Sequence, residues 1–248
     1  MRPLVLASIL LLAGCSGSRI AGLSLPASST AARACGAGTV RVLGTSRVAF
    51  AAAAPRGAVA YTTPGGRRLA RFGPKNVNRY PTVFEVLGER LDSSCRATWY
   101  RVQLPIRPNG AAGWVRAADV VLHPVRTRIV VDLARRTLTL YRSGRVLIRT
   151  AVAVGAPATP TPTGHYYVNQ RLVPAEPNGP YGPAALGVSA YSNVLTGWAQ
   201  GGPIGIHGTN EPWSIGRAVS NGCIRVPNAT LARVFALADA GTPVTIDA

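Results

Sequence analysis

The chain has 248 residues and a formal net charge of +18, from 27 Lys and Arg residues against 9 Asp and Glu residues. A charge this high is typical of proteins that bind nucleic acid, but the basic residues are spread out, with no run beyond Arg67-Arg68 and Arg135-Arg136, and the N-terminus predicts export. We therefore expect no nucleic-acid partner, and because no group of Cys, His and carboxylate residues has metal-ligand spacing, we expect no metal and no cofactor.

The N-terminal residues predict an export signal. A positive charge at Arg2 precedes an apolar run that is too short to cross a bilayer as a stable helix. The stretch Leu12-Ala13-Gly14-Cys15 resembles a bacterial lipobox, which implies cleavage before Cys15 and a lipid on its thiol; an ordinary signal peptide cut elsewhere is the alternative. We expect a signal peptide over 1–15, a flexible tether over 16–35, and a protein held through a lipid anchor at the extracytoplasmic face of a bacterial membrane or cell wall.

Residues 36–122 predict a small all-β domain, because short apolar runs alternate with glycine and proline turns. The expected strands are 39–43, 58–61, 82–87, 99–104 and 113–115. The runs Trp99-Tyr100-Arg101-Val102 and Gly113-Trp114-Val115 resemble the last strands of bacterial SH3-like domains, which implies a small barrel of a kind commonly assigned to wall binding. Trp99, Tyr100 and Trp114 either pack in its core or, if exposed, stack on a sugar or peptide.

Residues 126–248 predict a second domain that is mainly β, with one or two short helices. The expected strands are 128–132, 137–141, 146–154, 165–168, 186–191, 205–206 and 244–246. The prolines of 159–164 exclude a central strand there, and we expect 171–183 to form a loop over the site, a candidate substrate lid. A helix with Asn228 as its cap and Gly241 at its end is expected to bury one apolar face, formed by Leu231, Val234, Phe235 and Ala238.

Within this domain, His207-Gly208-Thr209 precedes Ser220-Asn221-Gly222-Cys223-Ile224-Arg225, so that a histidine stands 16 residues before a cysteine. A thiol is a weak nucleophile until a base takes its proton, and an imidazole in reach can take that proton and return it to a leaving amine. Backbone N–H groups around Gly222 and Cys223 can face the oxyanion of an acyl-transfer intermediate. On a strand, Arg225 shares a face with Cys223 and can lower the pKa of the thiol or hold a substrate carboxylate. The alternative is that Arg225 only braces the motif structurally.

The motif resembles that of the L,D-transpeptidase family (YkuD-type catalytic domain), over residues 126–248. This resemblance implies a β-sandwich and an acyl transfer between peptidoglycan stem peptides through a cysteine thioester. It assigns Cys223 as the nucleophile, His207 as the general base and the carbonyl of Gly208 as the group that orients the imidazole. The other residues that we expect to contact substrate are Ser220, Asn221, Gly222 and Arg225, together with Trp213 of the connecting loop, which can wall the groove or only pack against its own loop.

Asn221 stands where many members of the family have a second histidine, and it can donate hydrogen bonds but cannot titrate.

Three alternative functions are compatible with the same sequence. Water as the acceptor would make the protein an L,D-carboxypeptidase, and a protein amine would make it a protein-to-wall ligase. A wall-binding or structural lipoprotein with a degenerate catalytic domain is the non-enzyme alternative. Under each of these functions we expect a monomer. The NlpC/P60 peptidases also carry SH3-like domains, but there the cysteine precedes the histidine, whereas His207 precedes Cys223 here.

Two cysteines remain once Cys15 is assigned to the anchor and Cys223 to chemistry. An exported chain meets an oxidising environment, so we expect Cys35 and Cys95 to form a disulfide, with two buried free thiols as the alternative. Closing a loop of this length would stabilise the fold by roughly 4 kcal/mol on the chain-entropy model.

Overall fold

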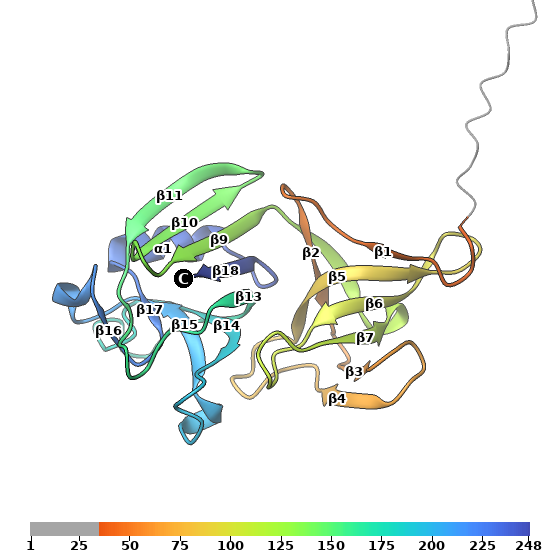
Figure 1. The fold of residues 1–248 in the computed structure, drawn as a ribbon, viewed down its shortest axis with the longest axis horizontal. Coiled ribbons are helices and arrows are strands. Elements are labelled where there is room, and N and C mark those ends of the chain that lie inside the picture. Colours follow the sequence, from red (N-terminus) through yellow and green to blue (C-terminus); the bar gives the residue numbers. More distant parts are fainter. Residues whose placement is uncertain (1–34) are drawn as a thin grey trace, which may run out of the picture. The chain divides into compact units, whose positions relative to one another are not determined.

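The computed structural model of the chain describes residues 35–248, which form one compact unit. The predicted signal peptide, the predicted lipid anchor at Cys15 and nearly all of the predicted tether lie outside the described residues. The described chain is mainly β, as predicted, with one α-helix (Figure 1). No helix within residues 35–248 is long and apolar enough to span a membrane.

The first half of the described chain forms one sheet with its own hydrophobic core. Its strands follow the spatial order β4-β3-β7-β6-β5-β2-β8, with β1 paired to β5. The bounds are β1 Val40–Val42, β2 Ala49–Ala53, β3 Ala58–Tyr61, β4 Arg68–Phe72, β5 Val83–Leu91, β6 Ala97–Gln103, β7 Ala112–Arg116 and β8 Val121–Val125, with a 3-10 turn at Ala117–Asp119. The core is built from alternate residues of these strands, and Phe84 and Val102 are fully buried in it.

The five strands predicted for this half are present, and three more were missed. β2 is rich in alanine and β4 carries two arginines, so neither has a strong strand pattern, and Pro124 in β8 is tolerated because β8 is an edge strand. Tyr100 packs against the core. Trp99 and Trp114 are half-buried instead, and Trp99 packs edge-on against Tyr61. The resemblance of this sheet to SH3-like domains stays a prediction.

The second half forms a sheet in the order β11-β10-β9-β18-β13-β14-β15-β17 and a separate pair, β12-β16. The bounds are β9 Thr127–Asp132, β10 Thr137–Arg142, β11 Arg145–Ala151, β12 Val154–Gly155, β13 Gly164–Leu172, β14 Ala185–Tyr191, β15 Pro203–His207, β16 Ala218–Ser220, β17 Ile224–Arg225, α1 Asn228–Leu237 and β18 Pro243–Asp247, with 3-10 turns at Ala199–Gly201 and Pro212–Ser214. Leu231 and Val234 of α1 are fully buried in a core shared with β9, β13 and β18.

Several details of this half differ from the sequence predictions. The helix α1 ends at Leu237, with Ala238 as its C-cap, rather than at Gly241. β13 continues to Leu172, so the loop expected over 171–183 begins only after it. Asn228 does not cap α1: the N-cap is Pro227, and the side-chain oxygen of Asn228 accepts a hydrogen bond from the backbone N–H of Thr209 at 2.8 Å. Asn228 is therefore used to hold the segment after His207 rather than to start the helix.

The two halves are separated in sequence by Arg126 alone, and they are joined by hydrogen bonds. The side chain of Gln103 donates to the carbonyl of His165 at 2.6 Å and accepts from the hydroxyl of Ser189 at 3.0 Å. The buried hydroxyl of Tyr167 donates to the carbonyl of Val83 at 3.1 Å. Because these groups are buried and polar, separation of the halves would leave them unpaired; the domain boundaries at 122 and 126 stay predictions.

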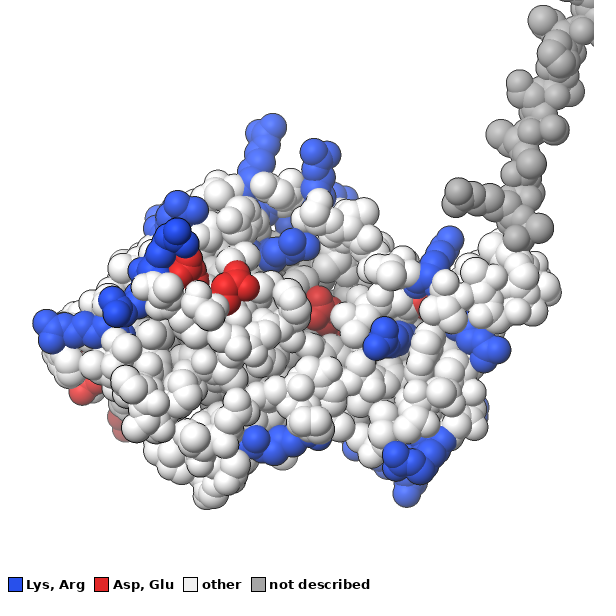
Figure 2. Space-filling model, in the orientation of Figure 1, with Lys and Arg blue, Asp and Glu red and all other residues white. Residues whose placement is uncertain are grey.

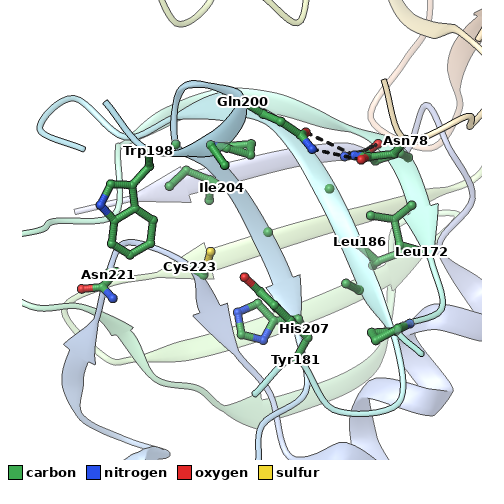
Figure 3. Close-up of a pocket in the computed structure, with 18 of the residues that line it drawn as sticks. Asn78, Leu172, Tyr181, Leu186, Trp198, Gln200, Ile204, His207, Asn221 and Cys223 are labelled. Carbon is green, nitrogen blue, oxygen red and sulfur yellow. Dashed lines mark hydrogen bonds between the residues drawn. The ribbon is translucent and has the colours of Figure 1, made fainter. Parts of the chain in front are cut away.

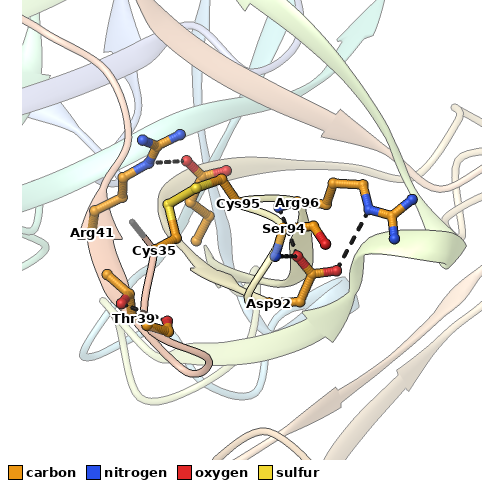
Figure 4. Close-up of a disulfide and its surroundings, with 9 residues drawn as sticks. Cys35, Thr39, Arg41, Asp92, Ser94, Cys95 and Arg96 are labelled. Carbon is orange, nitrogen blue, oxygen red and sulfur yellow. Dashed lines mark hydrogen bonds and ion pairs between the residues drawn. A yellow bond between two sulfur atoms is a disulfide. The ribbon is translucent and has the colours of Figure 1, made fainter. Parts of the chain in front are cut away.

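The structure contains the expected disulfide between Cys35 and Cys95 (Figure 4). It ties the first described residue to the turn between β5 and β6. The carboxylate of Asp92 organises this turn by accepting hydrogen bonds from the backbone N–H groups of Ser94 and Arg96, at 2.8 and 3.0 Å. The disulfide therefore joins a terminal segment to a turn that is already ordered.

The positive charges do not gather in a single patch on the face shown in Figure 2, where Lys and Arg side chains are scattered with a few acidic side chains among them. This distribution follows from the sequence, in which no dense basic run occurs.

Candidate active site

His207 is the last residue of β15, and Cys223 directly precedes β17. β15 and β17 pair in parallel, with His207 beside Arg225. Cys223 stands one residue before this strand pair, and its sulfur accepts a hydrogen bond from the backbone N–H of Gly205 in β15. Both the thiol and the imidazole line a cavity of about 560 Å3 (Figure 3). The two residues that the sequence singled out are thus brought to one site.

The imidazole of His207 is held in one tautomer. Its Nδ1 lies 2.5 Å from the carbonyl oxygen of Gly208, which can only accept, so Nδ1 carries the proton and Nε2 is the acceptor. Burial lowers the pKa of His207 to about 4; the Gly208 hydrogen bond opposes this and the charge of Arg225 adds to it. The side chain is 5% exposed. At neutral pH the ring is therefore an uncharged base.

The thiol of Cys223 is only partly exposed, and burial raises its pKa above the ordinary value. The backbone N–H of Gly205 and the charge of Arg225 act in the opposite direction, but burial is the larger effect. Arg225 thus lowers the pKa of the thiol, as expected, but this effect is smaller than the opposite effect of burial. The resting site holds a neutral thiol beside a neutral imidazole.

The loop that carries Cys223 is braced by its own residues. The hydroxyl of Ser220 donates to the carbonyl of Cys223 at 2.6 Å and accepts the N–H of Gly222 at 3.1 Å. The N–H of Gly222 is thereby occupied, which corrects the expectation that it faces an oxyanion. The N–H of Cys223 donates to no acceptor among the described residues. Gly222 has φ of +105°, a conformation that residues with a Cβ rarely adopt.

Two threonines of the proline-rich segment 159–164 hold the same loop. The hydroxyl of Thr159 donates to the carbonyl of Ser220, and that of Thr161 donates to the carbonyl of Gly222, each at 2.9 Å. Thr161 is buried and also accepts the N–H of Gly155 at 2.8 Å. The sequence predicted only a turn here. The hydrogen bond from Thr161 to Gly222 could not be predicted, because the two residues are far apart in sequence.

Close packing fixes the segment after His207. A Cβ added to Gly208 would lie 2.3 Å from the side-chain oxygen of Asn228 and 2.9 Å from the Cα of Gly182. Gly182 belongs to the loop that carries Tyr181, so this contact also sets the position of that loop. The carbonyl of Gly208 can orient the imidazole because its own backbone is held in this way.

Of the other predicted site residues, Asn221 lines the cavity, whereas Arg225 and Trp213 do not. Arg225 forms an ion pair with Glu211, and its guanidinium is largely buried. Trp213 is 56% exposed and lies under the guanidinium of Arg217, 5.8 Å from the ring centroid. The structure therefore gives Arg225 a bracing and electrostatic role and does not place Trp213 at the groove.

Several cavity residues were missed by sequence reasoning. Tyr181 is 54% exposed and meets the imidazole of His207 edge-on, with ring centroids 5.0 Å apart. Trp198 is 53% exposed and walls the cavity beside Asn221 (Figure 3). Asn78 reaches the cavity from the other half of the chain. In the sequence, only the isolated aromatic residues in the loops before and after β14 could have indicated that these loops line the cavity.

Within residues 35–248, no three His, Cys, Asp or Glu side chains lie close enough together to hold a metal ion. The chemistry that the described site offers is that of a thiol, a fixed imidazole and a backbone N–H.

Comparisons with known proteins agree on one family. Residues 126–246 match the family model described as the L,D-transpeptidase catalytic domain, YkuD. The YkuD protein of Bacillus subtilis, which carries a provisional L,D-transpeptidase name, is 35% identical over 150 residues, covering 58% of this chain and 84% of its own. The YkuD protein of Bacillus licheniformis, named in the same way, is 34% identical over 168 residues, covering 64% of this chain and 94% of its own. Among solved structures, the catalytic domain of an E. faecium L,D-transpeptidase is 28% identical and covers 48% of this chain and 95% of that one, with a TM-score of 0.36.

Proposed function

Because this chain belongs to the L,D-transpeptidase family, we propose that it is a peptidoglycan L,D-transpeptidase that joins stem peptides through a thioester on Cys223. The observation that carries the proposal is that Cys223 and His207 line one cavity, at the adjoining strands β17 and β15, with the acceptor nitrogen of the imidazole set by the Gly208 carbonyl.

In the first half-reaction, Nε2 of His207 takes the thiol proton as the sulfur of Cys223 attacks the carbonyl carbon of the third residue of a tetrapeptide stem. The oxygen that becomes negative is stabilised by the N–H of Cys223. The bond to the terminal D-alanine then breaks, the imidazolium returns its proton to the leaving amine, and a thioester remains.

In the second half-reaction, the side-chain amine of a neighbouring stem attacks the thioester carbonyl and gives its proton to His207. The bond between carbon and sulfur breaks, and the thiolate recovers the proton from the imidazolium. The product is an amide that links two third residues. In this scheme Ser220 and Gly222 hold the loop, Asn221 contacts substrate, and Arg225 positions the loop through Glu211.

We also propose that the enzyme works outside the cytoplasmic membrane and is held there through a lipid on Cys15. The disulfide between Cys35 and Cys95 supports an oxidising compartment, and the lipobox-like sequence supports the anchor.

The test is mass spectrometry of stem tetrapeptides after incubation with the wild-type chain, with Cys223→Ala and with His207→Gln. Cross-linked dimers from the wild type alone are expected, together with a carbapenem adduct at Cys223. Shortened tripeptides without dimers would instead assign an L,D-carboxypeptidase. No product from a folded wild-type chain would refute both activities on this substrate and favour the wall-binding alternative.

A further inference from the structure

A second cavity, of about 400 Å3, adjoins the one that holds the thiol. The two cavities share four wall residues, namely Asn78, Gln170, Gln200 and Pro203. One side of the second cavity is formed by the first half of the chain, from the end of β4 through the following loop to the start of β5, together with Pro105. The other side is formed by β13, the end of β14, Gln200 and the first residue of β15. It therefore lies where the two halves of the chain meet, next to the catalytic cavity.

The wall between the cavities is made of side-chain amides. The amide nitrogens of Asn76 and Asn78 both donate to the side-chain oxygen of Gln170, at 2.7 and 3.0 Å. Asn78 and Gln200 pair in both directions, at 3.3 and 3.1 Å (Figure 3). These bonds hold the amide side chains in place between the two cavities. The peptide groups of a ligand that extends from one cavity to the other would therefore lie against polar rather than apolar side chains.

The charge of the second cavity is positive. Arg71 and Lys75 line it, and none of the described residues that line it is acidic. Neither cation forms an ion pair with another residue of 35–248. Lys75 is also the only lysine in the chain, whose other basic residues are all arginine. A lysine ammonium is a compact charge that attracts a carboxylate at the open edge of a cavity.

One buried acceptor in this wall has no partner. Asn169 lines the second cavity, and its side-chain oxygen is buried and accepts no hydrogen bond from the described residues. An unpaired buried acceptor is costly, and an N–H or O–H donor from a ligand would satisfy it. The cavity thus offers two cations for an anion and one acceptor for a donor.

We propose that the second cavity is a remote substrate subsite, which binds a carboxylate-bearing part of the peptide whose carbonyl Cys223 attacks. This inference rests on the proposed function for the identity of the peptide. Lys75 and Arg71 hold the carboxylate, Asn169 accepts a peptide N–H, and the amide wall lies along the peptide between this subsite and the thiol. The first sheet is then part of the substrate site of the enzyme, because it supplies both cations.

The experiment compares two synthetic stem tetrapeptides that differ only in the second residue, which carries either a free carboxylate or its carboxamide. Binding to the full chain with Cys223→Ala is measured by calorimetry, with and without Lys75→Gln. We expect Lys75→Gln to weaken binding of the carboxylate peptide about five- to tenfold and that of the carboxamide peptide less than twofold. Lys75→Arg should restore the preference, and Arg67→Gln, which removes an exposed cation that lines neither cavity, should change nothing.

In the wild-type background, Lys75→Gln should raise KM for the carboxylate peptide without lowering kcat, and leave the rate at which iodoacetamide alkylates Cys223 unchanged. Equal weakening of both peptides, an unchanged affinity, or no binding by the Cys223→Ala chain would overturn the subsite. If the wild type forms no product while Lys75 still discriminates between the peptides, the proposed function fails and the subsite stands.

Discussion

The protonation state of the resting site can be tested directly. Burial places the pKa of His207 at about 4 and raises the pKa of the Cys223 thiol above its ordinary range. Both effects make transfer of the thiol proton to the imidazole in the empty site unfavourable. We expect a neutral pair that becomes reactive only when substrate is bound, rather than a preformed thiolate and imidazolium.

The assay is the rate of alkylation of Cys223 by iodoacetamide between pH 5 and pH 10, followed by mass mapping of the peptide that contains it. Only the thiolate reacts, so the rate should rise about tenfold for each pH step of one up to at least pH 9. A preformed ion pair would instead react at a nearly constant rate from about pH 6 to pH 8, and that plateau would refute the reasoning.

His207→Gln separates the two roles of the imidazole. Because the neutral ring does not hold a thiolate in the empty site, the substitution should change the alkylation profile by less than about threefold. Turnover should fall by about 10²- to 10⁴-fold, the usual contribution of general base catalysis. Equal losses in alkylation and turnover would mean that His207 sets the charge of the thiol before substrate binds.

The remaining predictions concern stability. Thr161→Val removes two buried hydrogen bonds and should lower the free energy of unfolding by about 1–3 kcal/mol in urea titrations, whereas Thr163→Val, at an exposed position, should be neutral within error. Gly208→Ala should destabilise by more than about 2 kcal/mol, because its Cβ would lie 2.3 Å from a buried side-chain oxygen, while Gly197→Ala meets no atom within 4 Å and serves as the control. In the folded chain the pKa of His207 is about 4, against an ordinary value of 6.5, so the unfolded chain binds the proton at a higher pH. The free energy of unfolding should therefore fall by about 3 kcal/mol as the pH is lowered from 6.5 towards 4. This loss should be absent from His207→Gln.

The sequence was most informative where the chemistry is local. The His-Gly-Thr and Ser-Asn-Gly-Cys-Ile-Arg segments predicted the thiol and its base, because their residue types and order carry the pattern. Strands with alternating apolar residues, such as those around Phe84 and Leu140, were also predicted, since one face of each is buried. Alanine-rich β2 and arginine-bearing β4 were missed, because their pairing is decided by neighbouring strands rather than by their own composition.

Contacts between distant segments could not be predicted. Thr161 reaches the carbonyl of Gly222 across 61 residues, and Asn78 reaches Gln200 across 122. Trp213 illustrates the converse error: its position in the loop between His207 and Cys223 suggested a wall of the groove, but it packs under Arg217 instead. Proximity in sequence to a catalytic residue is a weak guide to which side chains line its cavity.

The wall of the catalytic cavity depends on both halves of the chain. The guanidinium of Arg107 donates to the carbonyls of Ser192 and Gly201, at 2.7 and 2.8 Å, at the two ends of the loop that carries Trp198. The Asn78–Gln200 pair holds the same loop between those ends. A fragment that begins at residue 126 would retain the thiol and the imidazole but lose every one of these bonds. The first half of the chain therefore shapes the wall of the cavity that holds Cys223 and His207.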